Sequence, residues 1–499
     1  MPELSTAVPV QRLNALNEAP LRPDRDYVLY WMTASRRTRH SFALDRACEL
    51  ARELDKPLAV LEALRVDYRW ASDRLHRFVI DGMADQAARF AEAGVRYHPY
   101  VEPEPGAGAG LVETLAERAA AVVCDEWPCF FLRGLPAKVA PRLDVHVEMV
   151  DGCGLLPLRA SDRVFTRAHS FRRHLQKNLA AHLTALPSSD PLASLPKHDA
   201  ATLSRAVLDR WPATSKRLLE GALDELPIDH GVAPSPTLRG GESAARRRLR
   251  SFLSDDLDSY GDGRNHPDDD AASGLSPWLH FGQISSHEIL AAIAERQGWT
   301  PEDVAPKATG KREGWWGMSA GAEAFLDELV TWREVGLNMC FHRDDYDQLE
   351  SLPDWAKKTI AEHADDERPV LYDLDQLDAA ETGDEIWNAA QRQLVRDGRM
   401  HNYLRMLWGK KVLQWSASPQ EALRTLLYLN DKYALDGRDP NTLAGVGWVF
   451  GRFDRAWGPE RPVFGKVRYM TSANTARKLR LRRYLARWGA PADGQRLPT

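Results

Sequence analysis

Short apolar runs alternate with stretches of helical periodicity through the first 160 residues of the chain. The predicted strands lie at residues 27–32, 57–64, 95–100, 119–125 and 145–150. Between them, residues 42–54 and 73–93 carry apolar positions at helical spacing, and a further helix is expected near Leu111. Strands that alternate with helices predict an α/β domain built on a doubly wound, parallel sheet.

From residue 242 onward, almost every periodic stretch has helical spacing. The expected helices cover 244–257, 286–297, 320–338, 353–364, 385–396, 400–415 and 419–427. Pro- and Ser-rich segments at 186–196 and 229–236 cannot continue a helix. We therefore expect a flexible arm (1–24), an α/β domain (25–160), a linker (161–240), an all-α domain (241–488) and a tail (489–499).

Composition and cysteine usage narrow the class of protein. Hydrophobic residues make up 43% of the 499-residue chain and charged residues 27%, values typical of a globular protein. No stretch approaches twenty uninterrupted apolar residues, and the N-terminus lacks a secretion signal, so we expect a cytoplasmic protein without membrane contact. Five Cys fit a reducing compartment, and no Cys/His spacing typical of a zinc site occurs, so no metal is expected.

Charge is segregated along the chain, although the net charge is only −5. Residues 461–487 hold nine Lys or Arg and no acidic residue, whereas residues 365–385 hold nine acidic residues against one Arg. A basic tract on an otherwise acidic protein indicates a surface that binds a polyanion. A solvated basic helix would produce the same pattern.

Residues 386–450 combine several unusual motifs. M-H-N-Y-L-R-M begins at Met400, Trp408 and Trp415 follow two helical turns apart, and Y-L-N-D-K-Y-A-L-D-G-R-D-P-N begins at Tyr428. Each feature alone is more typical of core packing or a turn. Together with S-G-L-S-P-W-L-H-F-G-Q-I-S at 273–285 and R-P-V-F-G-K-V-R-Y-M at 461–470, the set resembles the photolyase and cryptochrome family, and within it the class II cyclobutane-pyrimidine-dimer photolyases.

The resemblance implies an all-α domain that binds FAD. It assigns to the cofactor Tyr260, Arg264, Ser273, Gly274, Leu275, Ser276, Asn402, Arg405, Asn430 and Asp436. Within this set it implies an Arg405–Asp436 ion pair beside the isoalloxazine ring and Asn430 opposite flavin N5. Ser276 followed by Pro277 has the sequence of a helix N-cap, and free N–H groups there suit a pyrophosphate, although a plain cap is the alternative. The family can also hold a second, antenna chromophore in its α/β domain; the sequence leaves its presence and identity open.

A lesion site is expected from two indoles and a carboxyl group. Glu328 and Trp332 lie one turn apart on a predicted helix, and Trp448 closes the G-V-G-W motif. Flat faces and one hydrogen-bonding group are what a flipped pyrimidine pair requires. The resemblance implies that these residues and Met406 hold the cyclobutane dimer, with Glu328 stabilising its radical anion. Taken alone, Glu328 is more typical of a solvent-facing glutamate.

The resemblance also implies an electron relay and a DNA-binding surface. The relay consists of Trp408 (nearest the flavin), Trp415 and Trp387, with Tyr372 as a further redox-capable neighbour. Hydrophobic packing is the alternative for these rings, and both can hold. Phosphate contacts, blind to sequence, are expected from Arg461, Lys466, Arg468, Arg477, Lys478, Arg480, Arg482 and Arg483.

The sequence therefore predicts a monomeric enzyme that repairs UV-damaged DNA with light. Excited reduced FAD donates an electron to a flipped cyclobutane dimer, the ring splits and the electron returns, which makes the protein a carbon–carbon lyase. Two alternatives stay open: a cryptochrome-like blue-light photoreceptor and repair of the (6-4) photoproduct. Glu328, Trp332 and Trp448, with no long extension after Arg487, argue against the first. The absence of a His pair beside the motifs argues against the second.

Overall fold

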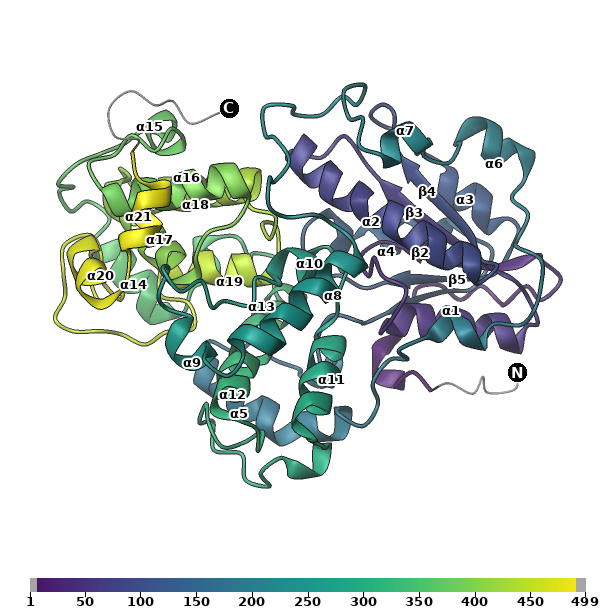
Figure 1. Cartoon of the computed structure of the whole chain (residues 1–499), viewed down its shortest axis with the longest axis horizontal. Helices are drawn as coiled ribbons and strands as arrows, with labels where there is room; N and C mark the ends of the chain where they lie inside the picture. Colours follow the sequence, from purple (N-terminus) through teal and green to yellow (C-terminus); the bar gives the residue numbers. More distant parts are fainter. Residues whose placement is uncertain (1–6, 491–499) are drawn as a thin grey trace.

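The computed structural model describes residues 7–490, and its first part is a six-stranded sheet flanked by helices (Figure 1). The strands are β1 (Leu13–Ala15), β2 (Tyr27–Met32), β3 (Leu58–Leu64), β4 (Arg96–Val101), β5 (Ala119–Asp125) and β6 (Val147–Val150). They follow the order β1-β6-β5-β2-β3-β4. Strands β2 to β6 run parallel, which confirms the predicted doubly wound sheet.

The central strands are buried on both faces, because helices cover both. Every residue of β2 and β5 is buried, as expected where helical crossovers cover a parallel sheet. Helices α1 (Phe42–Glu53) and α2 (Asp73–Glu92) pack on one face, with Val28 and Tyr30. Helices α3 (Leu111–Ala116) and α6 (Arg205–Arg210) pack on the other.

The predicted N-terminal arm contributes an edge strand to the sheet within its described residues, 7–24, while the predicted domain limits stay predictions. Strand β1 pairs antiparallel with β6, which makes the sheet mixed rather than wholly parallel. Arg12 is 1% exposed and donates hydrogen bonds to the carbonyls of Asp151, Gly154 and Leu155 at 3.1, 3.1 and 2.7 Å. A three-residue edge strand has no periodicity long enough to be recognised from sequence.

The second half is helical, as predicted. Its helices are α8 (Glu242–Ser251), α9 (Tyr260–Gly263), α10 (Ser276–His280), α11 (Ser286–Gln297), α12 (Ala320–Leu326), α13 (Arg333–His342), α14 (Asp354–Glu362), α15 (Leu374–Asp378), α16 (Glu385–Asp397), α17 (Asn402–Trp415), α18 (Pro419–Tyr433), α19 (Pro440–Val449), α20 (Ser472–Lys478) and α21 (Arg482–Trp488). The expected helix at 320–338 is interrupted by a π-helical segment, Asp327–Trp332. Such insertions frequently mark functional sites.

Part of the predicted linker belongs to the helical half. Helix α5 (Ala168–Asn178) buries Phe171 and Leu175 in the same core as the π-helical segment. Arg172 forms a bidentate ion pair with Asp327 at 2.6 and 3.0 Å, and both side chains are buried. Helix α5 therefore supports the π-helical segment, which carries Glu328 and Trp332.

The two halves are joined by buried polar contacts at the start of α13. The Glu334 carboxylate accepts the N–H groups of Leu155 and Leu156 at 2.7 and 3.1 Å, just beyond β6. Arg333 donates to the carbonyl of Cys153 at 2.8 Å. Within residues 7–490, no helix combines the length and hydropathy needed to cross a bilayer.

Candidate active site

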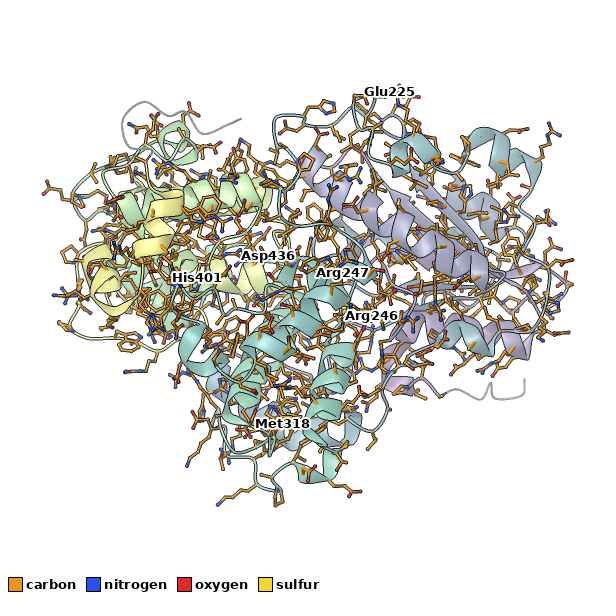
Figure 2. The ribbon with its side chains drawn as sticks, in the orientation of Figure 1. Glu225, Arg246, Arg247, Met318, His401 and Asp436 are labelled. Carbon is orange, nitrogen blue, oxygen red and sulfur yellow. The ribbon has the colours of Figure 1, made fainter. Side chains whose placement is uncertain are left out.

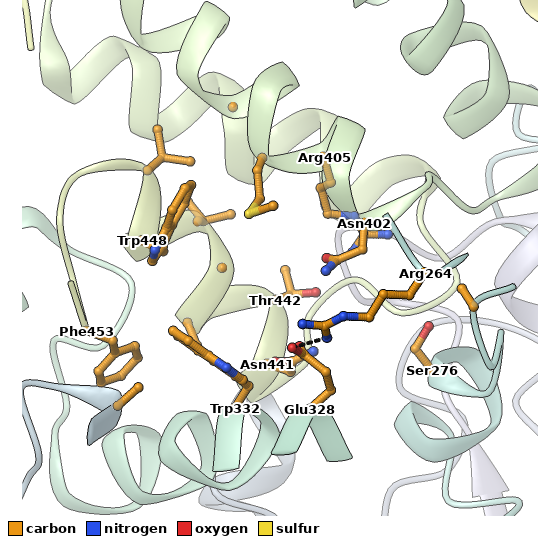
Figure 3. Close-up of a pocket in the computed structure, with 18 of the residues that line it drawn as sticks. Arg264, Ser276, Glu328, Trp332, Asn402, Arg405, Asn441, Thr442, Trp448 and Phe453 are labelled. Carbon is orange, nitrogen blue, oxygen red and sulfur yellow. Dashed lines mark hydrogen bonds and ion pairs between the residues drawn. The ribbon is translucent and has the colours of Figure 1, made fainter. Parts of the chain in front are cut away.

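A cavity of about 900 Å³ opens into the helical half (Figure 3). Its walls come from α5, α9, α10, the π-helical segment, α17, α18 and α19, together with residues 453–468. Ligand pockets in proteins usually enclose about 300–1,000 Å³. The volume is therefore sufficient for a ligand as large as a dinucleotide.

Most residues selected from the sequence line this cavity. They are Tyr260, Arg264, Ser273, Gly274, Ser276, Glu328, Trp332, Asn402, Arg405, Met406, Trp408, Asn430, Asp436, Trp448 and Arg468. Leu275 does not line it, because its side chain is 0% exposed and lies in the core. Figure 3 shows a division of the space: Trp448 and Trp332 lie on one side, and Arg405, Asn402 and Ser276 lie on the other.

The polar side contains the expected ion pair. Arg405 of α17 and Asp436, which precedes α19, are 3.0 Å apart. Both side chains remain partly exposed, at 24% and 15%. Burial alone would raise the pKa of Asp436, but the Arg405 charge and the Ser276 hydroxyl hold that pKa below its usual value. Asp436 is consequently a carboxylate at neutral pH; Figure 2 labels this residue within the helical half.

The S-G-L-S loop (residues 273–276) is held by hydrogen bonds from Arg248, a residue that the sequence did not single out. Arg248 of α8 donates to the carbonyls of Ser273 and Ala272, each at 2.7 Å. Gly274 has a φ of +65°, a conformation that side chains rarely adopt. Ser276 is the first residue of α10 and Leu275 occupies the N-cap position, so the predicted Ser276 N-cap is wrong by one residue. The Ser276 hydroxyl points toward the cavity instead (Figure 3).

Glu328 forms an ion pair with Arg264, between the two sides of the cavity (Figure 3). The Arg264 guanidinium also lies over the Tyr260 ring, 5.5 Å from its centroid. Burial raises the pKa of Glu328, and the charge of Arg264 opposes this rise. The carboxyl group is thus held in one orientation and can be protonated more easily than an exposed glutamate.

Trp448 is held between two basic side chains, Lys410 and Arg468. The Lys410 Nζ lies 4.5 Å from the indole centroid and donates to the carbonyl of Val449 at 2.6 Å, at the C-terminal end of α19. The Arg468 guanidinium lies 5.7 Å from the indole and pairs with Asp454 at 3.0 Å. Burial lowers the pKa of Lys410 well below its usual value. Lys410, which the sequence did not single out, therefore sets the position of Trp448.

Four aromatic rings form a continuous row from the cavity outward. Trp408 lines the cavity and stacks on Trp387 at 6.2 Å with nearly parallel planes (7°). Trp387 meets Trp415 edge-on at 5.6 Å, and Trp415 meets Tyr372 at 5.1 Å. Two turns of α17 place Trp408 and Trp415 on one face, but among the described residues their rings are connected only through Trp387 of α16.

The C-terminal basic tract is less free than its sequence suggests. Acidic residues from elsewhere in the chain pair with Lys466, Arg468 and Arg480. Arg483 donates to the carbonyl of Asp268. In the part of the chain that the structure describes, five members of the tract lack a carboxylate partner: Arg461, Arg477, Lys478, Arg482 and Arg483.

The similarity of the chain to curated proteins extends over nearly its whole length. A deoxyribodipyrimidine photo-lyase of Methanothermobacter thermautotrophicus is 35% identical over 480 residues, which cover 96% of this chain and 98% of that protein. Those of Oryza sativa subsp. japonica and Potorous tridactylus are 34% and 31% identical, over 92% and 97% of this chain and 87% and 85% of theirs. The chain belongs to the deoxyribodipyrimidine photo-lyase family. The predicted family and enzyme class are thereby confirmed, whereas class II membership stays a prediction.

Solved structures agree with this photo-lyase fold. A bacterial class III photolyase from Agrobacterium tumefaciens superposes with a TM-score of 0.66 at 19% identity, covering 93% of this chain and 86% of that one. A cryptochrome from Synechocystis sp. PCC6803 superposes with a TM-score of 0.68 at 14% identity, covering 93% and 88%. No family model matches the chain.

The photo-lyase cavity also has polar walls that the sequence did not indicate. Beyond the assigned residues it is lined by Arg167, His169, Lys311, Arg312, Arg399, His401, Asn441, Thr442 and Arg455. Burial lowers the pKa of His401 to about 4, so this ring is neutral at physiological pH. Asn441 and His401 lie inside the motifs already quoted, so their place in those motifs could have identified them as site residues. The basic residues are scattered over the sequence, and only folding gathers them.

Proposed function

We propose that this photo-lyase binds FAD and uses light to split cyclobutane pyrimidine dimers in DNA. The observation that carries the proposal is one cavity with two ends: Trp332 and Trp448 at one, the Arg405–Asp436 pair at the other. Glu328 lies between them (Figure 3). A lesion and a redox cofactor bound at these two ends would be within one enclosed space.

The residues at the polar end fit FAD. Ser273, Gly274 and Ser276 offer hydroxyl and backbone N–H groups to a diphosphate, whereas Leu275 is fully buried and does not reach the cavity. The Arg405–Asp436 pair and Asn430 offer charged and amide groups to the flavin ring. When bound and reduced, FAD supplies the electron that opens the cyclobutane ring and receives it back afterwards, so no net redox change occurs.

The apolar end supports lesion binding by this chain's own side chains. The indoles of Trp332 and Trp448 would stack against a flipped pyrimidine pair and exclude water from it. Glu328, held by Arg264, would form a hydrogen bond with a pyrimidine carbonyl, where negative charge accumulates as the ring opens. Burial raises the pKa of this carboxyl group, so it takes up a proton more easily than an exposed glutamate.

The aromatic row supports a role in activating the cofactor. Trp408, Trp387, Trp415 and Tyr372 are in sequential ring contact, so an electron can pass inward along them toward the cavity. The relay would act only when the bound cofactor needs to be reduced. It would not take part in splitting the lesion.

DNA contact and assembly complete the proposal. Exposed basic residues at the cavity rim, such as Arg167, Lys311 and Arg455, would neutralise phosphates near the flipped lesion, together with the unpaired members of the C-terminal tract. We propose that the protein acts as a cytoplasmic monomer on UV-damaged DNA. An absorption spectrum of the purified protein tests for an antenna chromophore in the α/β half together with the flavin.

The test compares three oligonucleotides carrying one cyclobutane dimer, one (6-4) photoproduct or no lesion. We expect illumination of the reduced holoenzyme to restore the first alone, with dark samples and Glu328→Gln as controls, and chromatography of digested DNA as the readout. His169 and His401 line the cavity, which the sequence argument against (6-4) repair overlooked, so the second substrate is essential. Restoration of neither lesion would favour a photoreceptor.

A further inference from the structure

The outer end of the aromatic row lies in an exposed apolar surface. Seven large hydrophobic side chains are exposed in the described residues, and three of them fall within five consecutive positions: Val370 (38%), Leu371 (55%) and Leu374 (37%). Tyr372 lies among them, just before α15, and Figure 1 shows α15 at the outer edge of the helical half. Scattered exposed leucines need no explanation, but a contiguous group is typical of an interaction site.

The surface around this group is strongly acidic. Of the nine acidic residues in 365–385, three pair with His363, Lys411 or Lys432. The other six are exposed and have no Lys or Arg partner within the described chain: Asp365, Glu367, Asp373, Asp375, Glu381 and Glu385. The lone arginine, Arg368, is turned toward the carbonyls of Ser416 and Asp366. The net charge of the surface is therefore negative.

Tyr372 is suited to pass an electron between this surface and the row. Its ring lies 5.1 Å from Trp415, and it is partly exposed. Its hydroxyl oxygen accepts a hydrogen bond from the Gly383 N–H at 2.8 Å. Within residues 7–490, the Tyr372 hydroxyl proton is not donated to any acceptor. That proton can consequently move to and from water when the phenol is oxidised and reduced.

We propose that Val370, Leu371 and Leu374 with Asp373 and Asp375, here called the Tyr372 surface, are the docking site of a one-electron reductant protein with a basic contact face. The inference rests on the proposed relay. When an electron has moved inward, Tyr372 is left oxidised and its proton has passed to water. The docked reductant then gives one electron, water returns the proton, and the phenol is restored while the reductant is oxidised by one electron.

Charge selects this occupant over two others. DNA phosphates and a second copy of this surface are both negative, so each would be repelled at close range. A basic protein would be attracted and steered, as in weak electron-transfer encounters, which bury little area. The three apolar side chains would supply a water-free centre next to Tyr372.

The experiment uses reduced cytochrome c, a basic one-electron donor, with the illuminated holoenzyme, and follows cytochrome oxidation at several salt concentrations. Asp373→Asn with Asp375→Asn should slow the reaction roughly tenfold at low salt, with the difference lost at high salt. Leu371→Ser should slow it at all salt concentrations. Ferrocyanide, an anionic donor, should react faster with the Asp373/Asp375 double variant than with the parent.

Matched controls lie on the α/β half. Glu104→Gln with Asp199→Asn neutralises two exposed carboxylates without cationic partners in the described chain, and Leu208→Ser alters a leucine that is 45% exposed. Both should match the parent. Equal rates for the controls and the Tyr372-surface variants would overturn the inference. A sedimentation coefficient that differs between the parent and the Leu371→Ser variant would also overturn it, because it would indicate that this surface is an interface between copies of the chain.

A dark measurement separates this inference from the proposed function. Cytochrome c binding, followed by calorimetry without light, should weaken in the Asp373/Asp375 double variant whether or not the relay operates. If Trp387→Phe leaves light-driven oxidation unchanged, the relay is wrong. If Trp387→Phe blocks cytochrome c oxidation but the surface variants bind cytochrome c in the dark as the parent does, the relay stands and the docking site is wrong.

Discussion

Replacing Trp448 by Ala should reduce discrimination between damaged and undamaged DNA without removing the cofactor. The indole lies at the end of the cavity opposite the Arg405–Asp436 pair (Figure 3), so its loss should leave the polar end intact. Stacking of a base on an aromatic side chain is worth roughly 1–3 kcal/mol. Because about 1.4 kcal/mol corresponds to a tenfold change, discrimination should fall by roughly 5- to 150-fold.

The assay measures dissociation constants by fluorescence anisotropy, in the dark and at fixed salt, for oligonucleotides with and without one cyclobutane dimer. Flavin content is read from the absorption spectrum of the same samples. Trp457→Ala is the matched control: Trp457 stacks on Arg468 at 4.1 Å, as a neighbour of Trp448, but does not line the cavity. Undamaged DNA should bind with nearly parental affinity in both variants.

Two results would refute the reasoning. If Trp448→Ala loses flavin yet keeps its discrimination, the lesion and cofactor ends have been exchanged. If Trp457→Ala has the same effect as Trp448→Ala, the loss comes from displaced Arg468 rather than from stacking.

Three further predictions address the relay, the basic tract and the ion pair. Trp387→Phe interrupts the row at its centre and should abolish photoreduction of oxidised FAD, while chemically reduced enzyme still repairs; a parallel loss of both activities would contradict the relay. Arg482→Ala should lower the salt slope of DNA binding by up to about one unit, and Arg480→Ala by less, because Asp269 already pairs with Arg480; equal slopes for both variants and the parent would leave the tract a solvated surface. The folded pKa of Asp436 lies below its unfolded value, so its stabilising effect is present above about pH 4 and is lost as pH falls through the folded pKa. Asp436→Asn should therefore lower the free energy of urea unfolding at neutral pH and flatten its decline in acid, and an unchanged acid profile would contradict the assignment.

The sequence by itself determined the architecture, because local patterns encode it. Residues 119–124 are apolar at every position since parallel strands are covered on both faces, and β5 consists of this run and Asp125, the limits predicted for it. Helix α11 also matches its predicted limits, from Ser286 to Gln297. Two features had no such signal. The edge strand β1 has only three residues, too few to show a period. The π-helical segment within 320–338 keeps the hydrophobic period of a helix, so the sequence does not reveal it.

The site was determined partly by sequence and partly by folding. Motifs with rigid local spacing placed Arg405, Asp436 and Trp448 in one cavity, as the resemblance implied. Only the tertiary structure showed that Trp387 joins Trp408 to Trp415, because the link crosses from one helix to another.

Charge was the property that sequence alone described least well. The basic tract is unbroken along the chain, yet folding brings Glu460, Asp454 and Asp269 against its members and neutralises part of it. Conversely, the basic residues at the cavity rim come from segments far apart in sequence. Electrostatic interaction depends on distance in space, and the fold alone determines which charges are near one another.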